Sequence, residues 1–161
     1  MPARAFASAL TLVVLRLSTP AKARAFRDVL DPPAAISAAA SKGLLNGLAR
    51  AGSRVVAVGQ RGHVVYSDDG GRTWTQAKVP VSSDLVAVAF PSASHGWAVG
   101  HDGVVLHSAD AGASWTRQLD GRSVGQNPEN PVLDVWFANE RSGFVVGAFN
   151  LILHTSDGGS S

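Results

Sequence analysis

Ser67-Asp68-Asp69-Gly70-Gly71-Arg72-Thr73-Trp74 is an octapeptide that the chain repeats. It returns as Ser108-Ala109-Asp110-Ala111-Gly112-Ala113-Ser114-Trp115, and its first seven positions return as Thr155-Ser156-Asp157-Gly158-Gly159-Ser160-Ser161. Asp69 and Asp110 are 41 positions apart, and Asp110 and Asp157 are 47 apart. These intervals are close to the period of about 40 to 45 residues that four-stranded propeller blades show. The repeat therefore predicts a β-propeller.

The sequence around each octapeptide predicts strands. Short apolar runs bounded by turn residues precede it, and such runs are typical of strands rather than helices. The middle repeat is complete, with strands expected at 85–90, 96–100, 103–108 and 114–119. Four antiparallel strands make one blade. We therefore expect an all-β fold of about three blades within 44–161, at 44–80, 84–120 and 132–161, the last of them incomplete.

The turn between the second and third strands of each repeat has its own signature. It reads Gln60-Arg61-Gly62, then His101-Asp102-Gly103, then Ala148-Phe149-Asn150. Glycine and asparagine are the residues that best tolerate a positive φ. Their presence at the last position of all three turns predicts a positive φ there.

The residue types of the octapeptide suit a hairpin turn. An aspartate side chain accepts hydrogen bonds from backbone N–H groups that follow it, glycine adopts angles that a β-carbon opposes, and an indole adds apolar burial. Catalysis or metal binding by these acids is the alternative, but an active site is needed once, so repetition favours structure. The structural positions are Ser67, Asp69, Gly71, Trp74, Ser108, Asp110, Gly112, Trp115, Thr155, Asp157 and Gly159.

The charge of the chain gives no support for nucleic-acid binding. It has 14 basic and 12 acidic residues, but four of the basic ones lie before residue 26, where there is no acid. The rest of the chain therefore carries a net charge of −2, so the basic isoelectric point belongs to the first residues. The absence of cysteine excludes disulfides and thiolate metal sites.

The first residues are typical of a secretory signal. Arg4 precedes an apolar run at 5–15, which is followed by small residues with cleavage expected after Ala25 or Ala23. A bilayer span needs about 20 apolar residues, so this run is too short to be one. An unstructured or wrongly started N-terminus is the alternative. We assign 1–25 to a signal peptide and 26–43, which shows no sustained periodicity, to a linker.

The octapeptide matches the Asp-box, or bacterial neuraminidase repeat, in which Ser or Thr, Asp, Gly, Thr or Ser, and Trp alternate with variable positions. The frame around it, especially Val56-Ala57-Val58-Gly59-Gln60-Arg61-Gly62 and Gly96-Trp97-Ala98-Val99-Gly100-His101-Asp102-Gly103, resembles the photosystem II stability/assembly factor-like family over about 44–161. The resemblance implies an exported, non-enzymatic, seven-bladed propeller, of which this chain would hold an N-terminal part with fewer than three full blades. Members from phototrophs assist assembly of a membrane photosystem complex, whereas similar proteins of other bacteria carry the label without that target.

The sequence favours neither glycoside hydrolysis nor metal binding. Sialidases share the Asp-box, but glycoside hydrolysis needs a nucleophile, an acid and, for a substrate carboxylate, an arginine cluster, and these are not evident. Tyr66, the only tyrosine, occupies the slot that His107 and His154 hold in the other repeats, which favours packing over metal binding. We expect no catalytic residue, metal or cofactor. The alternatives are a fragment of a sialidase-like glycoside hydrolase whose catalytic residues lie outside this chain, and a truncated gene product without activity.

The turns between the second and third strands form the candidate binding site. Because strands alternate in direction, these turns share one face with the connections between blades, and the octapeptides lie at the opposite face. The turn positions differ between copies while the octapeptide positions do not, which favours partner binding at the turns. Ordinary solvated turns are the alternative. The candidate binding residues are Arg61, His101, Asp102 and Phe149, beside the long loop at 120–131.

The sequence thus predicts an exported β-propeller scaffold of the periplasm, acting in protein-complex assembly. Its expected partner is a protein, such as a membrane protein complex, and not nucleic acid, and no membrane span is expected once the signal is removed. Blade faces that a full ring would bury predict poor solubility for the chain alone.

Overall fold

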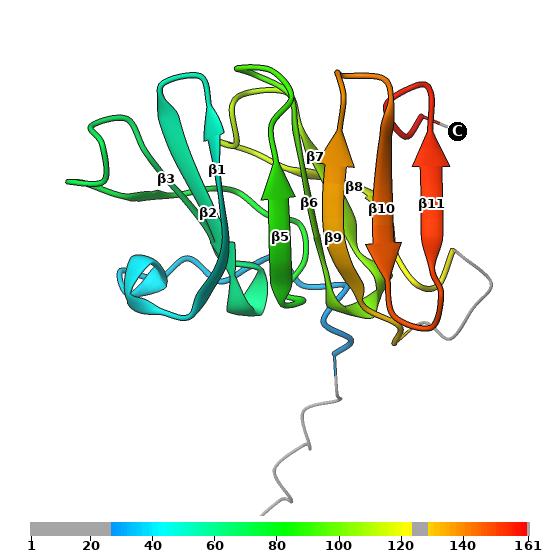
Figure 1. The fold of residues 1–161 in the computed structure, drawn as a ribbon. Helices are drawn as coiled ribbons and strands as arrows, with labels where there is room; N and C mark the ends of the chain where they lie inside the picture. The colour runs from blue at the N-terminus through cyan, green and yellow to red at the C-terminus, as the bar shows by residue number, and fades with distance from the viewer. Residues whose placement is uncertain (1–26, 124–128, 161) are drawn as a thin grey trace, which may run out of the picture.

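The computed structural model of the chain describes residues 27–123 and 129–160, and the signal-peptide prediction for 1–25 lies outside them. The described residues form three antiparallel sheets that follow one another along the chain (Figure 1). Blade 1 consists of β1 (Leu45–Ala51), β2 (Arg54–Gly59), β3 (Val64–Ser67) and β4 (Thr75–Gln76). Blade 2 consists of β5 (Leu85–Ala89), β6 (Gly96–Gly100), β7 (Val105–Ser108) and β8 (Thr116–Leu119), and blade 3 of β9 (Val132–Phe137), β10 (Gly143–Gly147) and β11 (Ile152–Thr155).

The prediction of an all-β chain built from consecutive blades is confirmed. Within each blade the hydrogen-bonded strand order is the order in the sequence, from β1 to β4, β5 to β8 and β9 to β11. Short 3-10 turns are the only helical elements of the described residues: η1 (Ala40–Lys42), η2 (Gln60–Gly62) and η3 (His101–Gly103). The innermost strands β1, β5 and β9 lie side by side, and each sheet fans outward from them (Figure 1).

The hydrophobic core lies between the blades. One cluster, which includes Val56, Leu85 and Leu106, fills the space between blades 1 and 2, and a second, around Trp97, joins blade 2 to blade 3. Blade 2 is covered on both faces, so every residue of its strand β6 is buried. The equivalent strand β10 of blade 3 alternates between buried and exposed positions because only one of its faces is covered.

The turns between the second and third strands adopt the positive φ that the sequence predicts. Gly62, Gly103 and Asn150 have φ of 69°, 66° and 63°. Replacing the glycine at 62 would also bring a β-carbon within 2.2 Å of the Val81 carbonyl oxygen, so this position tolerates no side chain. The residue before each of these also has a positive φ, a feature that the sequence analysis did not find: Arg61 at 58°, Asp102 at 56° and Phe149 at 56°.

The segment at 27–43, expected to be a linker, packs against blades 1 and 2. It contains no strand, but Leu30 and Ala34 are 3% and 7% exposed and belong to the core between the two blades. The Ala34 N–H donates to the Val79 carbonyl, and the Arg117 side chain donates to the Leu30 carbonyl. The segment therefore runs across the outer part of two blades and is held there by backbone hydrogen bonds and buried apolar side chains.

Candidate functional site

The octapeptide hairpin of blade 1 is closed by its aspartate. One oxygen of the Asp69 carboxylate, Oδ1, accepts hydrogen bonds from the backbone N–H groups of Arg72 and Thr73, both at 2.9 Å, and from the Ser67 hydroxyl at 2.8 Å. The other oxygen accepts the Thr73 hydroxyl at 2.6 Å. The Ser67 hydroxyl in turn accepts the Gly71 N–H at 2.8 Å. The carboxylate thus faces its own loop and not a substrate cleft.

The other two hairpins have the same arrangement. The Asp110 carboxylate accepts the Ser108 hydroxyl at 2.8 Å and the Ser114 N–H and hydroxyl at 2.8 and 2.6 Å. The Asp157 carboxylate accepts the Thr155 hydroxyl at 2.8 Å and the Ser160 N–H at 3.0 Å. All three aspartates therefore have the same structural role, because their carboxylate oxygens accept hydrogen bonds from groups of their own turns.

These hydrogen bonds stabilise the ionised form of the carboxylates. Those from the Thr73 hydroxyl and the Thr73 N–H, with the Ser67 hydroxyl, lower the pKa of Asp69 to about 2. Burial raises the pKa of Asp110, but the hydrogen bonds from Ser114 and Ser108 outweigh it, so that its pKa also lies below the usual value. Both hairpins are therefore held by a charged side chain at neutral pH.

The tryptophan that ends each octapeptide takes a place determined by the neighbouring blade. Trp115 is 4% exposed in the core between blades 1 and 2, with its ring 5.9 Å from that of Phe90 in an edge-to-face contact. Its indole N–H donates to the Gly112 carbonyl at 3.0 Å. Trp74 makes the same bond, to the Gly71 carbonyl at 3.1 Å, but its ring is only partly buried against blade 1.

A basic residue fastens the hairpin of blade 2 to blade 1. The Arg54 guanidinium lies 4.2 Å from the centre of the Tyr66 ring and pairs with Asp68 at 2.7 Å. It also donates to the carbonyls of Asp110 and Ala111 at 3.5 and 3.3 Å. Tyr66 therefore serves as a platform for this cation, which is a packing role.

The predicted binding residues lie at one end of the three blades, opposite the octapeptide hairpins. We call this the turn face: η2, η3 and the turn from Ala148 to Asn150 (Figure 1, lower edge). Asp84, in the connection between blades 1 and 2, fixes two of the turns, because its carboxylate accepts the Arg61 N–H at 2.6 Å and its carbonyl accepts the His101 N–H at 2.9 Å. The side chains of Arg61 and His101 are exposed.

The remaining candidates differ in how free their side chains are. Phe149 is 78% exposed. Asp102 is partly buried, and its carboxylate accepts the hydroxyl of Ser83, so it supports the turn rather than facing a partner. The long loop at 120–131 begins on this face with Asp120, which is 5% exposed and pairs with Arg122 at 3.0 Å, while 124–128 lie outside the described residues.

The structure brings together two histidines that the sequence analysis did not pair. His95 Nδ1 and His107 Nε2 are 3.2 Å apart, and the His107 ring lies 4.8 Å from the Trp97 ring. Burial and the neighbouring His95 lower the pKa of His107. The hairpin register gives the signal that was overlooked, since His107 pairs with Trp97 and His95 lies two positions before Trp97, which makes the two histidines diagonal neighbours. The described residues contain no cluster of three or more potential metal ligands.

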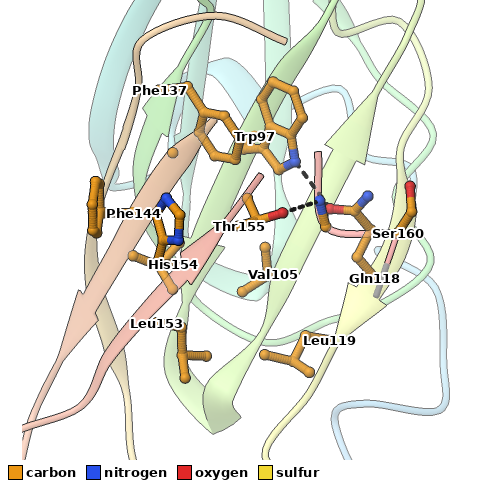
Figure 2. Close-up of a pocket in the computed structure, with 13 residues that line it drawn as sticks. Trp97, Val105, Gln118, Leu119, Phe137, Phe144, Leu153, His154, Thr155 and Ser160 are labelled. Atoms are coloured by element: carbon orange, nitrogen blue, oxygen red, sulfur yellow. Dashed lines mark hydrogen bonds between the residues drawn. The ribbon is translucent and has the colours of Figure 1, made fainter. Parts of the chain in front are cut away.

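A pocket of about 330 Å³ opens between blades 2 and 3 (Figure 2). Trp97 and Phe137 line one part of the pocket, and their rings stack with their centres 3.7 Å apart. Gln118 crosses another part, accepting the Trp97 indole N–H at 2.9 Å and donating to the Gly158 carbonyl at 2.8 Å. The lining of the pocket is mainly apolar, and it does not include the aspartates of the octapeptides.

Within the described ranges, no helix is long and apolar enough to cross a membrane.

Comparisons with known proteins agree with this fold. The chain resembles the solved structure of YCF48 bound to D1 peptide, with a TM-score of 0.60 and 22% identity, and that of YCF48 from Cyanidioschyzon merolae, with a TM-score of 0.61 and 25% identity. In each case 73% of this chain is covered, and it spans 38% of the solved chain's length. No curated protein matches the chain. The family model of the photosynthesis system II assembly factor YCF48 matches residues 16–104 and 48–129. Because these matches cover more than half of the sequence, the chain belongs to the YCF48 assembly factor family.

Proposed function

We propose that this chain is a non-catalytic scaffold that binds a peptide segment of a protein partner during the assembly of a protein complex. The observation that carries the proposal is the match to the YCF48 family over most of the chain. A solved relative is described as bound to a D1 peptide, which supports peptide binding as the activity of the fold. The three octapeptide carboxylates are engaged within their own turns, which supports a structural role for them rather than a catalytic one.

The turn face is the part of the chain that we assign to this binding. Arg61 and Phe149 are exposed on it at positions of positive φ, a conformation that costs roughly 1–2 kcal/mol for a residue with a β-carbon. Residues held in such a conformation are concentrated at functional sites. An exposed guanidinium and an exposed aromatic ring on the same face suit an extended peptide that offers a carboxylate to one and an apolar side chain to the other.

The same positive φ provides a clean test. Glycine adopts this conformation without strain, so Arg61→Gly removes the guanidinium while it keeps the turn. We expect Arg61→Gly combined with His101→Ala to weaken binding of a fluorescently labelled D1 peptide at least about tenfold, a loss of 1.4 kcal/mol. The matched control is Arg72→Ala, which removes an exposed arginine at the opposite end of blade 1. Equal peptide affinities of the wild type, the double variant and Arg72→Ala would refute the assignment to the turn face.

We also propose that the chain is exported and acts in the periplasm. The support is the run of apolar residues at 5–15 after Arg4, with small residues at the expected cleavage site. Fractionation of host cells with N-terminal sequencing of the product tests this. A mature N-terminus at residue 24 or 26 in the periplasmic fraction is the expected result, and an intact N-terminus in the cytoplasmic fraction would contradict it.

A further inference from the structure

We propose that His95 and His107 form a binding site for a divalent transition-metal ion, at the end of blade 2 that carries the octapeptide hairpin. This end lies opposite the turn face, so the site goes beyond the proposed function and does not depend on it. The ion belongs to the class that imidazole nitrogens prefer, which includes Zn²⁺, Cu²⁺ and Ni²⁺. The sequence analysis expected His107 to serve packing alone, because it did not pair this residue with His95.

The two ring nitrogens are separated by nearly the distance that one metal ion needs. His95 Nδ1 and His107 Nε2 are 3.2 Å apart, whereas the ring centres are 5.3 Å apart, so the rings present these nitrogens to each other. Two imidazole nitrogens on one zinc ion, each at about 2.0–2.1 Å and at the tetrahedral angle, are about 3.3–3.4 Å apart. An ion can therefore take the place of the hydrogen-bonded proton with little movement of either ring. That proton moves to the outer nitrogen of its own ring, so both rings stay neutral.

Both rings are held in position by blade 2. His107, on β7, lies against the Trp97 ring, with the ring centres 4.8 Å apart. The His95 backbone N–H donates to the Ser92 hydroxyl at 3.0 Å. The carbonyl of the adjacent Ser94 accepts a backbone N–H of the octapeptide hairpin at 2.9 Å. The loop that carries His95 is therefore attached to the hairpin, and a site that is already in place costs little ordering when its ligand binds.

The surroundings of His107 favour the uncharged ring, which is the form that binds a metal ion. Burial and the neighbouring His95 lower the pKa of His107, and the charge of Glu140, in the turn between β9 and β10, opposes this only in part. Because the described ranges contain no group of three potential metal ligands, water completes the coordination of the ion. The exposed Glu140 adds a negative charge nearby, and it belongs to blade 3.

The corresponding place in blade 1 already holds a cation. The strand registers make Arg54 the counterpart of His95, and they make Tyr66 the counterpart of His107. The Arg54 guanidinium lies 4.2 Å from the centre of the Tyr66 ring and donates to two carbonyls in the hairpin of the next blade. The fold therefore accommodates a positive charge here, where it links neighbouring blades. An ion on the two histidines puts a positive charge at the same place in blade 2.

Blade 3 has one half of the pair and therefore supplies the control. His154 is the counterpart of His107, and its ring lies against that of Phe144 with the centres 4.6 Å apart. The register makes Ser142 the counterpart of His95, so His154 has no imidazole in that position. We expect the ion to bind in blade 2 and not in blade 3.

The test is isothermal titration calorimetry of the full chain, without a polyhistidine tag, with Zn²⁺ alone. We expect one Zn²⁺ per chain, with affinity weakened at least about tenfold by His95→Gln and by His107→Gln, because each variant leaves a single ring nitrogen. The matched control is His154→Gln, which should leave the affinity and the stoichiometry unchanged. Mg²⁺ prefers oxygen ligands and should show no saturable binding that the two pair variants remove.

Unfolding in urea gives a second measurement. An ion that binds only the folded chain stabilises it, so Zn²⁺ should raise the urea midpoint of the wild type and of His154→Gln but not of His95→Gln. His95 lies in a loop, so this variant decides the outcome if His107→Gln does not fold. Absence of saturable Zn²⁺ binding to the wild type, or equal losses in His154→Gln and the pair variants, would overturn the proposal. Loss in only one of the two pair variants would also overturn it, because the site requires both rings.

Discussion

Trp115 gives the sharpest test of the packing between blades, because Trp74 is its built-in control. Both end an octapeptide and donate the indole N–H to a glycine carbonyl, at 3.0 and 3.1 Å. They differ in that Trp115 is 4% exposed between two blades, whereas Trp74 packs against blade 1 and is only partly buried. Truncation of a fully buried tryptophan costs about 3–5 kcal/mol, because it removes apolar contact and leaves a cavity. For a partly buried one we expect about 1–2 kcal/mol.

The measurement is urea unfolding of the full chain, followed by far-ultraviolet circular dichroism. With a slope of about 2 kcal/mol per molar urea, Trp115→Ala should lower the midpoint by about 1.5–2.5 M and Trp74→Ala by about 0.5–1 M. Trp115→Phe should lie between wild type and Trp115→Ala, since it retains part of the ring against Phe90 but loses the hydrogen bond. Equal losses for the two alanine variants would show that the indoles act only within their own hairpins and would refute the inter-blade role.

Three further predictions concern the hairpin charge, the inter-blade cation and the uncovered blade face. The pKa of Asp69 is lowered from 3.8 to about 2, so its contribution to stability is complete above about pH 4 and is lost as the pH falls through 2. Asp69→Asn should therefore flatten the fall of the unfolding free energy with decreasing pH in that window. An unchanged pH profile would contradict this. Arg54→Met should destabilise by about 1 kcal/mol at low salt and less at high salt, measured by urea midpoints, because salt screens the pair with Asp68, whose side chain is 62% exposed. Trp136 and Ile152 are 59% and 67% exposed on the outer face of blade 3, so replacing both by serine should reduce self-association in sedimentation experiments. No change would show that the chain does not self-associate through this face.

The parts of the fold that follow from local pattern could be predicted from the sequence. The apolar run at 96–100 is typical of a strand buried on both faces, and β6 is that strand. The glycine or asparagine that ends the turn between the second and third strands of each blade predicts a positive φ there, because few other residues tolerate it. These features depend on residues close together in the chain.

The parts that depend on distant contacts were not predictable. The segment at 27–43 has no periodicity that reveals its packing, and its attachment rests on bonds such as that between Arg117 and the Leu30 carbonyl, 87 positions apart. The positive φ of Arg61 was also missed, since arginine carries no signal for that conformation.

Binding of a protein segment at the turn face can be measured by hydrogen exchange of the full chain with and without the D1 peptide. We predict that the peptide slows exchange at η2, η3 and the turn from Ala148 to Asn150, with the octapeptide hairpins unchanged. Protection at the hairpins alone, or no protection anywhere at saturating peptide, would contradict it.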